Sequence, residues 1–272
     1  MLGDVVGKAG RDAVAAELPG LKDKLKADFV VVNGENAAHG FGLTRKIVDG
    51  FFEIGADAVT TGNHVWDQRE IIDWIDDEDR VIRPINYPEG TPGRGARTFQ
   101  LEDGKRVMVT QPMGRLFMDP LDDPFAAMDG ALRNQRLGRA GGGNLDAIIV
   151  DMHAETTSEK MAMGHYLDGR VSVVVGTHTH VPTGDAQVLP GGTAYQSDLG
   201  MCGDYNSVIG MKKEAAIDRF TKKLPAGRLE PAEGEATVCG VLVTTSNGSG
   251  LATSIEPVRV GGRLAPVMPA AV

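Results

Sequence analysis

The stretch "VSVVVGTHTH", residues 171–180, joins a short apolar run to two histidines. A run of this length, rich in valine and closed by Gly176, is typical of a strand buried in a parallel sheet. In an extended chain alternate side chains project from the same face, so we expect His178 and His180 to point the same way. Two of the six histidines of the chain lie here, and together they suit the binding of a shared ligand.

Three further runs have the same character: "DFVVVN" (28–33), "DAVTTG" (57–62) and "DAIIVDMH" (146–153). Each is rich in valine, isoleucine or threonine and is bounded by polar residues or glycine. Amphipathic segments lie between and around the runs, and the helices they predict are 10–26 with a break at Pro19, 43–54, 67–76, 124–136, 157–168 and 212–222. This alternation of strands and helices predicts an α/β fold built on a mainly parallel sheet.

Other segments have a different character. Residues 98–110 predict a hairpin with an Asp-Gly turn, and residues 236–260 predict antiparallel strands joined by a glycine-rich turn. Residues 111–145, rich in glycine, proline and methionine, are expected to form an insertion or cap. The strand around Asp4 is either very short or lacks residues upstream, because strands usually run about five to six residues. No internal repeat is evident, so we expect a single domain over 1–272.

Composition and charge narrow the function classes. The net charge of −9 argues against broad nucleic-acid binding, which needs a basic face. It leaves room for a small anionic substrate, because bound metal ions supply local positive charge. The two cysteines, Cys202 and Cys239, form neither a disulfide framework nor a CxxC site, and we expect a reducing cytoplasm. No apolar run approaches the roughly 18 residues that span a membrane.

Polar side chains follow five of the predicted strands, at the point where each strand ends. These residues are Asp4, Glu35, Asn36, Asn63, His64, His153, His178 and His180. Because the carboxyl ends of parallel strands share one edge of a sheet, we expect the side chains to meet there. Mixed oxygen and nitrogen donors suit manganese, iron or zinc better than calcium. They are too many for one tetrahedral zinc ion, so two ions sharing a carboxylate are favoured, an arrangement typical of phosphoester hydrolysis.

The motifs that carry these residues run in order over nearly the whole chain. They are "GDVVGKAGR", "NGEN", "GNHVWD", "DMHAE", "GTHTHVPT" and "DLGMCGDYNSVIGM". Together they resemble the YmdB-like branch of the calcineurin-type metallophosphoesterases. The chain departs from the general superfamily in lacking a histidine two positions after Asp4, and in having Glu35 where aspartate is usual, followed by Asn36. Both departures are typical of the YmdB-like branch, in which the asparagine takes the place of the missing histidine.

The resemblance implies a four-layer α/β/β/α sandwich of the metallo-dependent phosphatase type. It also implies two metal sites bridged by Glu35, the first formed by Asp4, Glu35, Asn36 and His180 and the second by Glu35, Asn63, His153 and His178. The ions are divalent or of mixed valence, with iron or manganese expected and zinc as an alternative. His64 resembles the catalytic histidine of the family. The implied reaction is hydrolysis of small phosphodiesters, notably 2′,3′-cyclic nucleotides, by attack of a metal-bridging hydroxide on phosphorus.

Other interpretations stay open at this point. The family resemblance also covers proteins of RNA processing and biofilm control, so a regulatory protein that acts by binding a protein partner is the main alternative. A mononuclear metal amidase is a weaker one, and the number of ions per chain separates it from a two-metal enzyme. Asp151 and Glu155, which flank His153, are candidates to orient that imidazole. Cys202 is expected to be a small packed residue, and a homo-oligomer is a further expectation.

Overall fold

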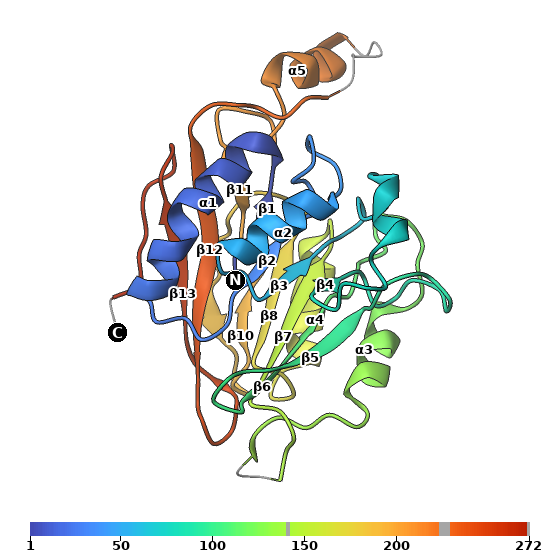
Figure 1. Cartoon of the computed structure of the whole chain (residues 1–272), viewed down its shortest axis with the longest axis vertical. Coiled ribbons are helices and arrows are strands. Elements are labelled where there is room, and N and C mark those ends of the chain that lie inside the picture. Colours follow the sequence, from blue (N-terminus) through green and yellow to red (C-terminus); the bar gives the residue numbers. More distant parts are fainter. Residues whose placement is uncertain (140–141, 223–228, 271–272) are drawn as a thin grey trace.

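The computed structural model describes residues 1–139, 142–222 and 229–270. Two β-sheets pack face to face at its centre, and helices cover the outer face of each sheet (Figure 1). The four-layer α/β/β/α sandwich expected from the family resemblance is therefore confirmed. Within the described residues, no helix is both long enough and apolar enough to cross a membrane.

The first sheet consists of a three-stranded and a four-stranded part that meet at a two-residue strand in the middle. Its members, from one edge to the other, are β4 (Val81–Ile82), β3 (Ala58–Thr60), β2 (Val31–Asn33), β1 (Asp4–Val5), β11 (Met201–Asp204), β12 (Ala236–Thr245) and β13 (Ala252–Val260). Leu2 joins the two halves of the sheet through β-bridges to Val32 on one side and Gly240 on the other. The long β12–β13 pair is antiparallel, as predicted for residues 236–260.

The second sheet contains the stretch with the two histidines. Its order is β5 (Ala96–Gln100), β6 (Arg106–Thr110), β7 (Ala147–His153), β8 (Val173–Thr177), β10 (Ala194–Gln196) and β9 (Gln187–Val188). The four central strands are parallel, which agrees with the apolar runs of β7 and β8. The edge strands β5 and β9 are antiparallel to their neighbours, and β5 with β6 forms the predicted hairpin.

The helices occupy the two outer layers. Those that pack on the first sheet are α1 (Gly7–Lys24), α2 (Arg45–Glu53) and the 3-10 helix η1 (Arg69–Asp73). Those that pack on the second sheet are α3 (Pro124–Leu132) and α4 (Thr157–Tyr166). A further helix, α5 (Lys213–Lys222), projects from the top of the molecule in Figure 1. Between the sheets, Val173 and Val175 of β8 pack against Val241 of β12.

Three expectations about local structure were wrong. Helix α1 runs through Pro19 without a break, because Pro19 is exposed while Leu18 and Leu21 are buried in the core, and their packing offsets the lost hydrogen bond. The segment expected as a helix over 67–76 forms only the short η1. The expected strand over 171–180 ends at Thr177, because β8 has no neighbour to pair with beyond that point.

Of the predicted insertion 111–145, residues 140–141 lie outside the described residues, and the rest lies partly in the core and partly beside the carboxyl edge of the second sheet. Helix α3 packs its Met128 and Leu132 onto the outer face of that sheet. Met113 forms a β-bridge with His153, and the Gly114 N–H donates to the His153 carbonyl at 2.9 Å. The stretch after Gly114 therefore starts next to the ends of the strands, where a cap over the predicted site is expected.

Candidate metal centre

The residues predicted from strand ends converge on the carboxyl edge of the two sheets. Two groups of side chains there place their ligand atoms within 4.8 Å of one another in the described part of the chain. One group contains Asp4, Glu35 and His180, and the other contains Glu35, His153 and His178. Glu35 belongs to both groups, which is the arrangement that a bridging carboxylate requires.

Glu35 follows β2 and is almost completely buried. Its Oε2 lies 3.2 Å from His153 Nε2 and accepts a hydrogen bond of 3.3 Å from the His64 N–H. Its Oε1 is buried without any hydrogen-bond partner. A buried carboxylate oxygen that meets no donor is costly, and a cation is the partner that would satisfy it. A Cβ at Gly62 would lie 2.0 Å from Glu35 Oε2, so only glycine fits beside this carboxylate.

In the first group, hydrogen bonds from neighbouring backbone fix which atoms face the site. His180 Nδ1 donates to the carbonyl of Ile209 at 2.8 Å, which leaves Nε2 with its lone pair. That Nε2 lies 3.2 Å from Asn36 Oδ1 and 3.9 Å from Asp4 Oδ1. Asn36 Nδ2 donates to the Gly40 carbonyl, so the amide oxygen is the atom turned toward the group. Nitrogen and oxygen lone pairs thus converge from separate segments.

The second group is oriented in the same way. His153 Nδ1 lies 2.8 Å from Thr177 Oγ1, and the Thr177 hydroxyl donates to Asp151 at 2.6 Å. His153 Nδ1 must therefore be the donor to Thr177, and Nε2 is the nitrogen that faces the site and would release its proton to bind a metal ion. This Nε2 lies 2.9 Å from the side-chain oxygen of Asn63. The His178 ring packs edge-on against the His153 ring, with 4.8 Å between the ring centres.

Asp151 connects the two sheets directly beneath the site. This buried carboxylate accepts hydrogen bonds from Asn33 of β2 and Thr60 of β3 in the first sheet, from Thr177 of β8 in the second sheet, and from Gln111 just after β6. It supports His153 through Thr177 and not by direct contact. Glu155, the other candidate partner of His153, instead lies 3.1 Å from His178 Nε2.

The two histidines that follow β8 do not continue an extended strand. His178 has a φ of 94° and His180 a φ of 66°, values in the left-handed region that non-glycine residues rarely adopt. The expectation that both project from one face of an extended chain was therefore wrong. The turn separates them, so that His178 joins the group with His153 and His180 joins the group with Asp4. Strain of this kind is typical of functional sites.

Burial and mutual charge shift the titration of the central groups. Burial raises the pKa of Asp4 to about 7, although His180 opposes the shift. Burial also acts to raise the pKa of Glu35, but His153 outweighs it and lowers the value to about 2. For His153, burial favours a lower pKa, yet Glu35 and Asp4 raise it to about 9. Burial and the neighbouring His153 lower the pKa of His178 to about 3. The Glu35 carboxylate is thus paired with a protonated His153, whose Nε2 proton a metal ion would replace.

His64 lies at the open side of the site. Its backbone N–H reaches Glu35, and its side chain is 26 % exposed. His64 Nδ1 lies 2.8 Å from the carboxylate of Asp67, and the ring packs edge-on against Phe41 with 5.0 Å between the ring centres. Asp67 thus orients the imidazole and leaves Nε2 free for a substrate atom.

Apart from Asp151, the residues that support this site were not predicted from the sequence. Asp67 carried a usable signal, because it lies three positions after His64 within "GNHVWD". Lys160 and Asp198 form a buried ion pair of 2.8 Å, and Asp198 accepts hydrogen bonds from Thr179 between the two histidines. The sequence around Lys160 did not indicate this ion pair, because its Met-rich helix predicted only hydrophobic packing.

Comparison with known proteins places the chain in a family. A family model described as "YmdB-like protein" matches residues 1–258. The chain belongs to this family. The 2′,3′-cyclic-nucleotide 2′-phosphodiesterase of Bacillus subtilis strain 168 is 48 % identical over 259 residues, which cover 95 % of each chain.

Solved structures agree with the YmdB-like assignment. A hypothetical protein from Thermus thermophilus superimposes with a TM-score of 0.88 and 43 % identity, covering 96 % of this chain and 98 % of that one. A structure described as a novel phosphatase of Mycoplasma pneumoniae gives a TM-score of 0.85 and 34 % identity, covering 96 % and 92 %. The fold of this YmdB-like chain is thus that of phosphatase-type relatives, whereas the roles of the individual ligands stay predictions.

Proposed function

We propose that this YmdB-like chain is a dinuclear metal-dependent phosphodiesterase that hydrolyses small phosphodiesters such as 2′,3′-cyclic nucleotides. The activity named for the Bacillus subtilis relative supports the substrate class. The observation that carries the proposal is the position of Glu35 in both ligand groups, with one buried oxygen that has no protein partner. A structural carboxylate of this kind would be expected to have its hydrogen bonds satisfied within the protein.

The donor set fits two ions of the kind that the family resemblance implies. Carboxylate, amide and imidazole atoms suit iron and manganese, with zinc as an alternative. Asp4, Glu35, Asn36 and His180 would hold one ion, and Glu35, Asn63, His153 and His178 would hold the other. When bound, two such ions withdraw charge from the phosphoryl oxygens and activate water for attack on phosphorus. The chain itself fixes the ligand atoms through Ile209, Thr177 and Gly40.

His64 is the group to which we assign proton transfer. The Asp67 carboxylate accepts from the Nδ1–H, and when the ring also carries a proton on Nε2, this second proton passes to the oxygen of the leaving alcohol. For a 2′,3′-cyclic nucleotide, that oxygen leaves as the ribose 2′-hydroxyl if the product follows the name of the relative. Phe41, against the His64 ring, limits how far this imidazole can turn.

Three further predictions concern the location of the protein, its oligomeric state and a protein partner. A cytoplasmic location is supported by two buried free thiols, Cys202 and Cys239. Burial raises the pKa of Cys202, which argues for a packed residue and against a nucleophile. An RNA-processing partner stays a prediction from the family resemblance, and homo-oligomer formation stays a separate prediction.

The test is turnover by purified protein loaded with Mn²⁺ or Fe²⁺, with bis-p-nitrophenyl phosphate and 2′,3′-cAMP as substrates. Glu35→Gln should abolish turnover and lower the metal content, because it removes the charge shared by both groups. Glu53→Gln is the matched control, since Glu53 is exposed at the end of α2. If the metal-loaded wild-type protein showed no turnover, the proposed phosphodiesterase activity would be refuted. Cellular effects that survive a variant without turnover would favour the regulatory alternative.

A further inference from the structure

The loop over 115–122 lies beside the metal centre. Just before it, the Gly114 N–H donates to the His153 carbonyl at 2.9 Å, and at its end the Asp122 N–H donates to the Asn86 carbonyl at 3.1 Å. His153 is one of the candidate ligands, so the loop leaves the second sheet directly next to the second ligand group. We call residues 115–122 the rim loop.

Contacts to the rest of the fold hold both ends of the rim loop. The backbone N–H groups of Arg115 and Leu116 donate to the Glu159 carboxylate, in the first turn of α4, at 2.9 and 3.1 Å. At the other end, the Asn86 side chain donates to the Asp122 carbonyl at 2.9 Å. These bonds involve the backbone of the loop, so they hold it whatever side chain its tip carries.

Phe117 lies at the tip of the rim loop with its ring in solvent. The residue is 91 % exposed, and its φ of 61° lies in the left-handed region that phenylalanine rarely adopts. The next residue, Met118, instead packs on the core of the second sheet. An exposed aromatic ring on a strained backbone gains nothing from packing within the fold, and such strain is typical of sites that contact a ligand.

Tyr87 relates the rim loop to the metal centre. It follows Asn86, whose side chain holds the end of the loop. Burial raises the pKa of Tyr87, and the charges of Asp119 in the rim loop and of Glu35 at the metal centre act in the same direction. Because electrostatic interactions weaken with distance, a hydroxyl that responds to both carboxylates lies close to both. The rim loop and the metal centre thus flank one side chain.

The other aromatic rings near the metal centre already have partners. Phe41 packs edge-on against His64, and Trp66 packs edge-on against Tyr87 with 5.9 Å between the ring centres. Among the described residues, none of the aromatic ring pairs includes Phe117. Its exposure leaves both faces of the ring open, and an open aromatic face favours another flat ring as its partner. Phe117 is therefore suited to stack on a planar ligand.

We propose that Phe117 stacks on the nucleobase of a nucleotide whose phosphodiester lies at the metal centre. The inference rests on the proposed phosphodiesterase function, which places the phosphodiester there. From Gly114 beside His153, three residues of chain span at most about 11 Å, so the ring stays near the centre. The ribose holds the base away from the phosphate, so the base projects from the buried ligand groups to the rim. Phe117 then selects nucleotides over phosphodiesters that have no base.

The first test compares two cyclic phosphodiesters on the Mn²⁺-loaded protein. These are 2′,3′-cAMP and glycerol 1,2-cyclic phosphate, which has the same five-membered ring but no base. Phe117→Ala should lower kcat/KM for 2′,3′-cAMP by about 5- to 100-fold, mainly through KM, because the stacking contact is lost. The loss for glycerol 1,2-cyclic phosphate should be about twofold or less. Equal losses for the two substrates would overturn the proposal.

Further variants separate stacking from apolar contact in general. Phe117→Trp keeps a flat ring and should retain the preference for 2′,3′-cAMP, whereas Phe117→Leu keeps only apolar surface and should lose most of it. The matched control is Phe220→Ala, because Phe220 is 76 % exposed on α5, outside the rim loop, and should change neither substrate. A Phe117→Leu variant with the selectivity of the wild-type protein would contradict stacking.

A second test measures binding without turnover. The probe is the 3′-phosphate of 2-aminopurine riboside, whose fluorescence falls when its base stacks on an aromatic ring. The metal-loaded wild-type protein should quench it, and Phe117→Ala should not. Quenching without turnover of any phosphodiester would keep the base contact and refute the proposed phosphodiesterase. Turnover of 2′,3′-cAMP with equal quenching by both proteins would do the reverse.

The same variant shows whether Phe117 instead contacts another copy of the chain. Light scattering gives the mass of the wild-type protein and of Phe117→Ala in solution. An unchanged mass is expected. A smaller mass for Phe117→Ala, with unchanged quenching of the probe, would overturn the proposal and assign the exposed ring to an interface between copies.

Discussion

Lys160 and Asp198 form an ion pair of 2.8 Å in which both side chains are at most 2 % exposed. Asp198 also accepts hydrogen bonds from the Thr179 N–H at 3.1 Å and the Thr179 hydroxyl at 2.7 Å. Because Thr179 lies between His178 and His180, the pair fixes the left-handed turn that places these histidines in different ligand groups.

Replacing Lys160 by methionine should destabilise the fold strongly. The change leaves Asp198 as an unpaired buried charge, and such losses cost about 3–5 kcal/mol in the free energy of unfolding. Chemical denaturation measures the effect, and elemental analysis should show a reduced metal content. The matched control is Lys222→Met, because Lys222 pairs with Asp218 on an exposed helix face at 2.8 Å. There we expect less than about 1 kcal/mol. Equal losses in both variants would contradict the structural role of the buried pair.

His178 and His180 should each be needed for the binding of a different metal ion. His178→Ala and His180→Ala are each expected to lower the metal content from about two ions per chain to about one, with turnover of bis-p-nitrophenyl phosphate lost in both. Elemental analysis after gel filtration measures the stoichiometry. His165→Ala, at an exposed position of α4, should keep both ions. Full metal occupancy in either of the first two variants would contradict the proposed division.

His64 should affect proton transfer more than metal binding. His64→Ala should lower kcat by about 10²–10⁴-fold for 2′,3′-cAMP, whose alkoxide leaving group needs a proton. The loss should be smaller for bis-p-nitrophenyl phosphate, whose leaving group is stable as an anion. Asp67→Asn should show the same pattern in milder form, because it weakens the contact that orients the imidazole. Equal losses for the two substrates would argue against a general acid at this position.

Thr177 should affect the affinity for metal although it is not itself a proposed ligand. Thr177→Val removes the hydroxyl that links His153 to Asp151, and losses of such outer contacts cost about 10–100-fold in metal affinity. Competition with a metal-binding dye gives the dissociation constant. Thr61→Val is the matched control, since that buried hydroxyl bonds to the Ile82 carbonyl and to no histidine. An unchanged affinity in Thr177→Val would show that Asp151 supports only the sheets.

The protonation of His153 predicts how pH acts on the metal-free protein. In the metal-free fold its pKa rises from 6.5 to about 9, so the folded state holds a proton that the unfolded state releases. This contribution to stability is complete below pH 6.5 and is lost as pH rises toward 9. Metal binding must displace the same proton, so affinity should increase over that pH range and protons should be released. Calorimetry in buffers of different ionisation enthalpy counts them; no release at about pH 7.5 would contradict the assignment of His153 as a ligand.

The sequence predicted the fold class and the convergence of the candidate ligands at one edge because both depend on local patterns. Short valine-rich runs determine parallel strands, and the residues after Val32, Thr60 and Thr177 must then meet at one edge of the sandwich. The expectation of manganese, iron or zinc followed from the types of the candidate ligand residues alone. The number of layers in the sandwich followed from the family resemblance.

The remaining features depend on contacts between distant residues. Asp198 supports Thr179 only because β8 and β10 are neighbours, and no pattern around Lys160 distinguishes a buried ion pair from ordinary helix packing. The left-handed turn at His178 is likewise determined by the Asp198 contacts and not by its own residues. The helix break predicted at Pro19 was wrong because the packing of α1 places this proline on the exposed face of the helix. The local sequence does not show that packing.

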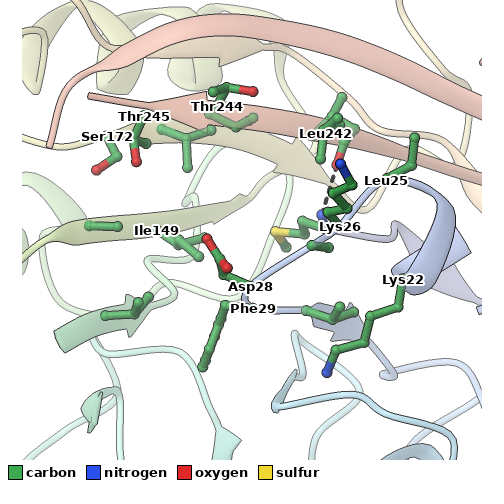
Figure 2. A pocket seen from close by; sticks show the side chains of 18 of the residues that line it. Lys22, Leu25, Lys26, Asp28, Phe29, Ile149, Ser172, Leu242, Thr244 and Thr245 are labelled. Atoms are coloured by element: carbon green, nitrogen blue, oxygen red, sulfur yellow. Dashed lines mark hydrogen bonds between the residues drawn. The ribbon is translucent and has the colours of Figure 1, made fainter. Parts of the chain in front are cut away.

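Asp151 gives the sandwich two unlike ends. At the carboxyl edge, the Asp151 carboxylate joins Asn33 and Thr60 of the first sheet to Thr177 of the second sheet and to Gln111 next to it. At the opposite edge, a cavity of about 300 Å³ lies between the sheets, lined by Ile149 and Val243 among others (Figure 2). Local opening of the fold is therefore expected to reach Val243 before His153, and amide hydrogen exchange would measure that order.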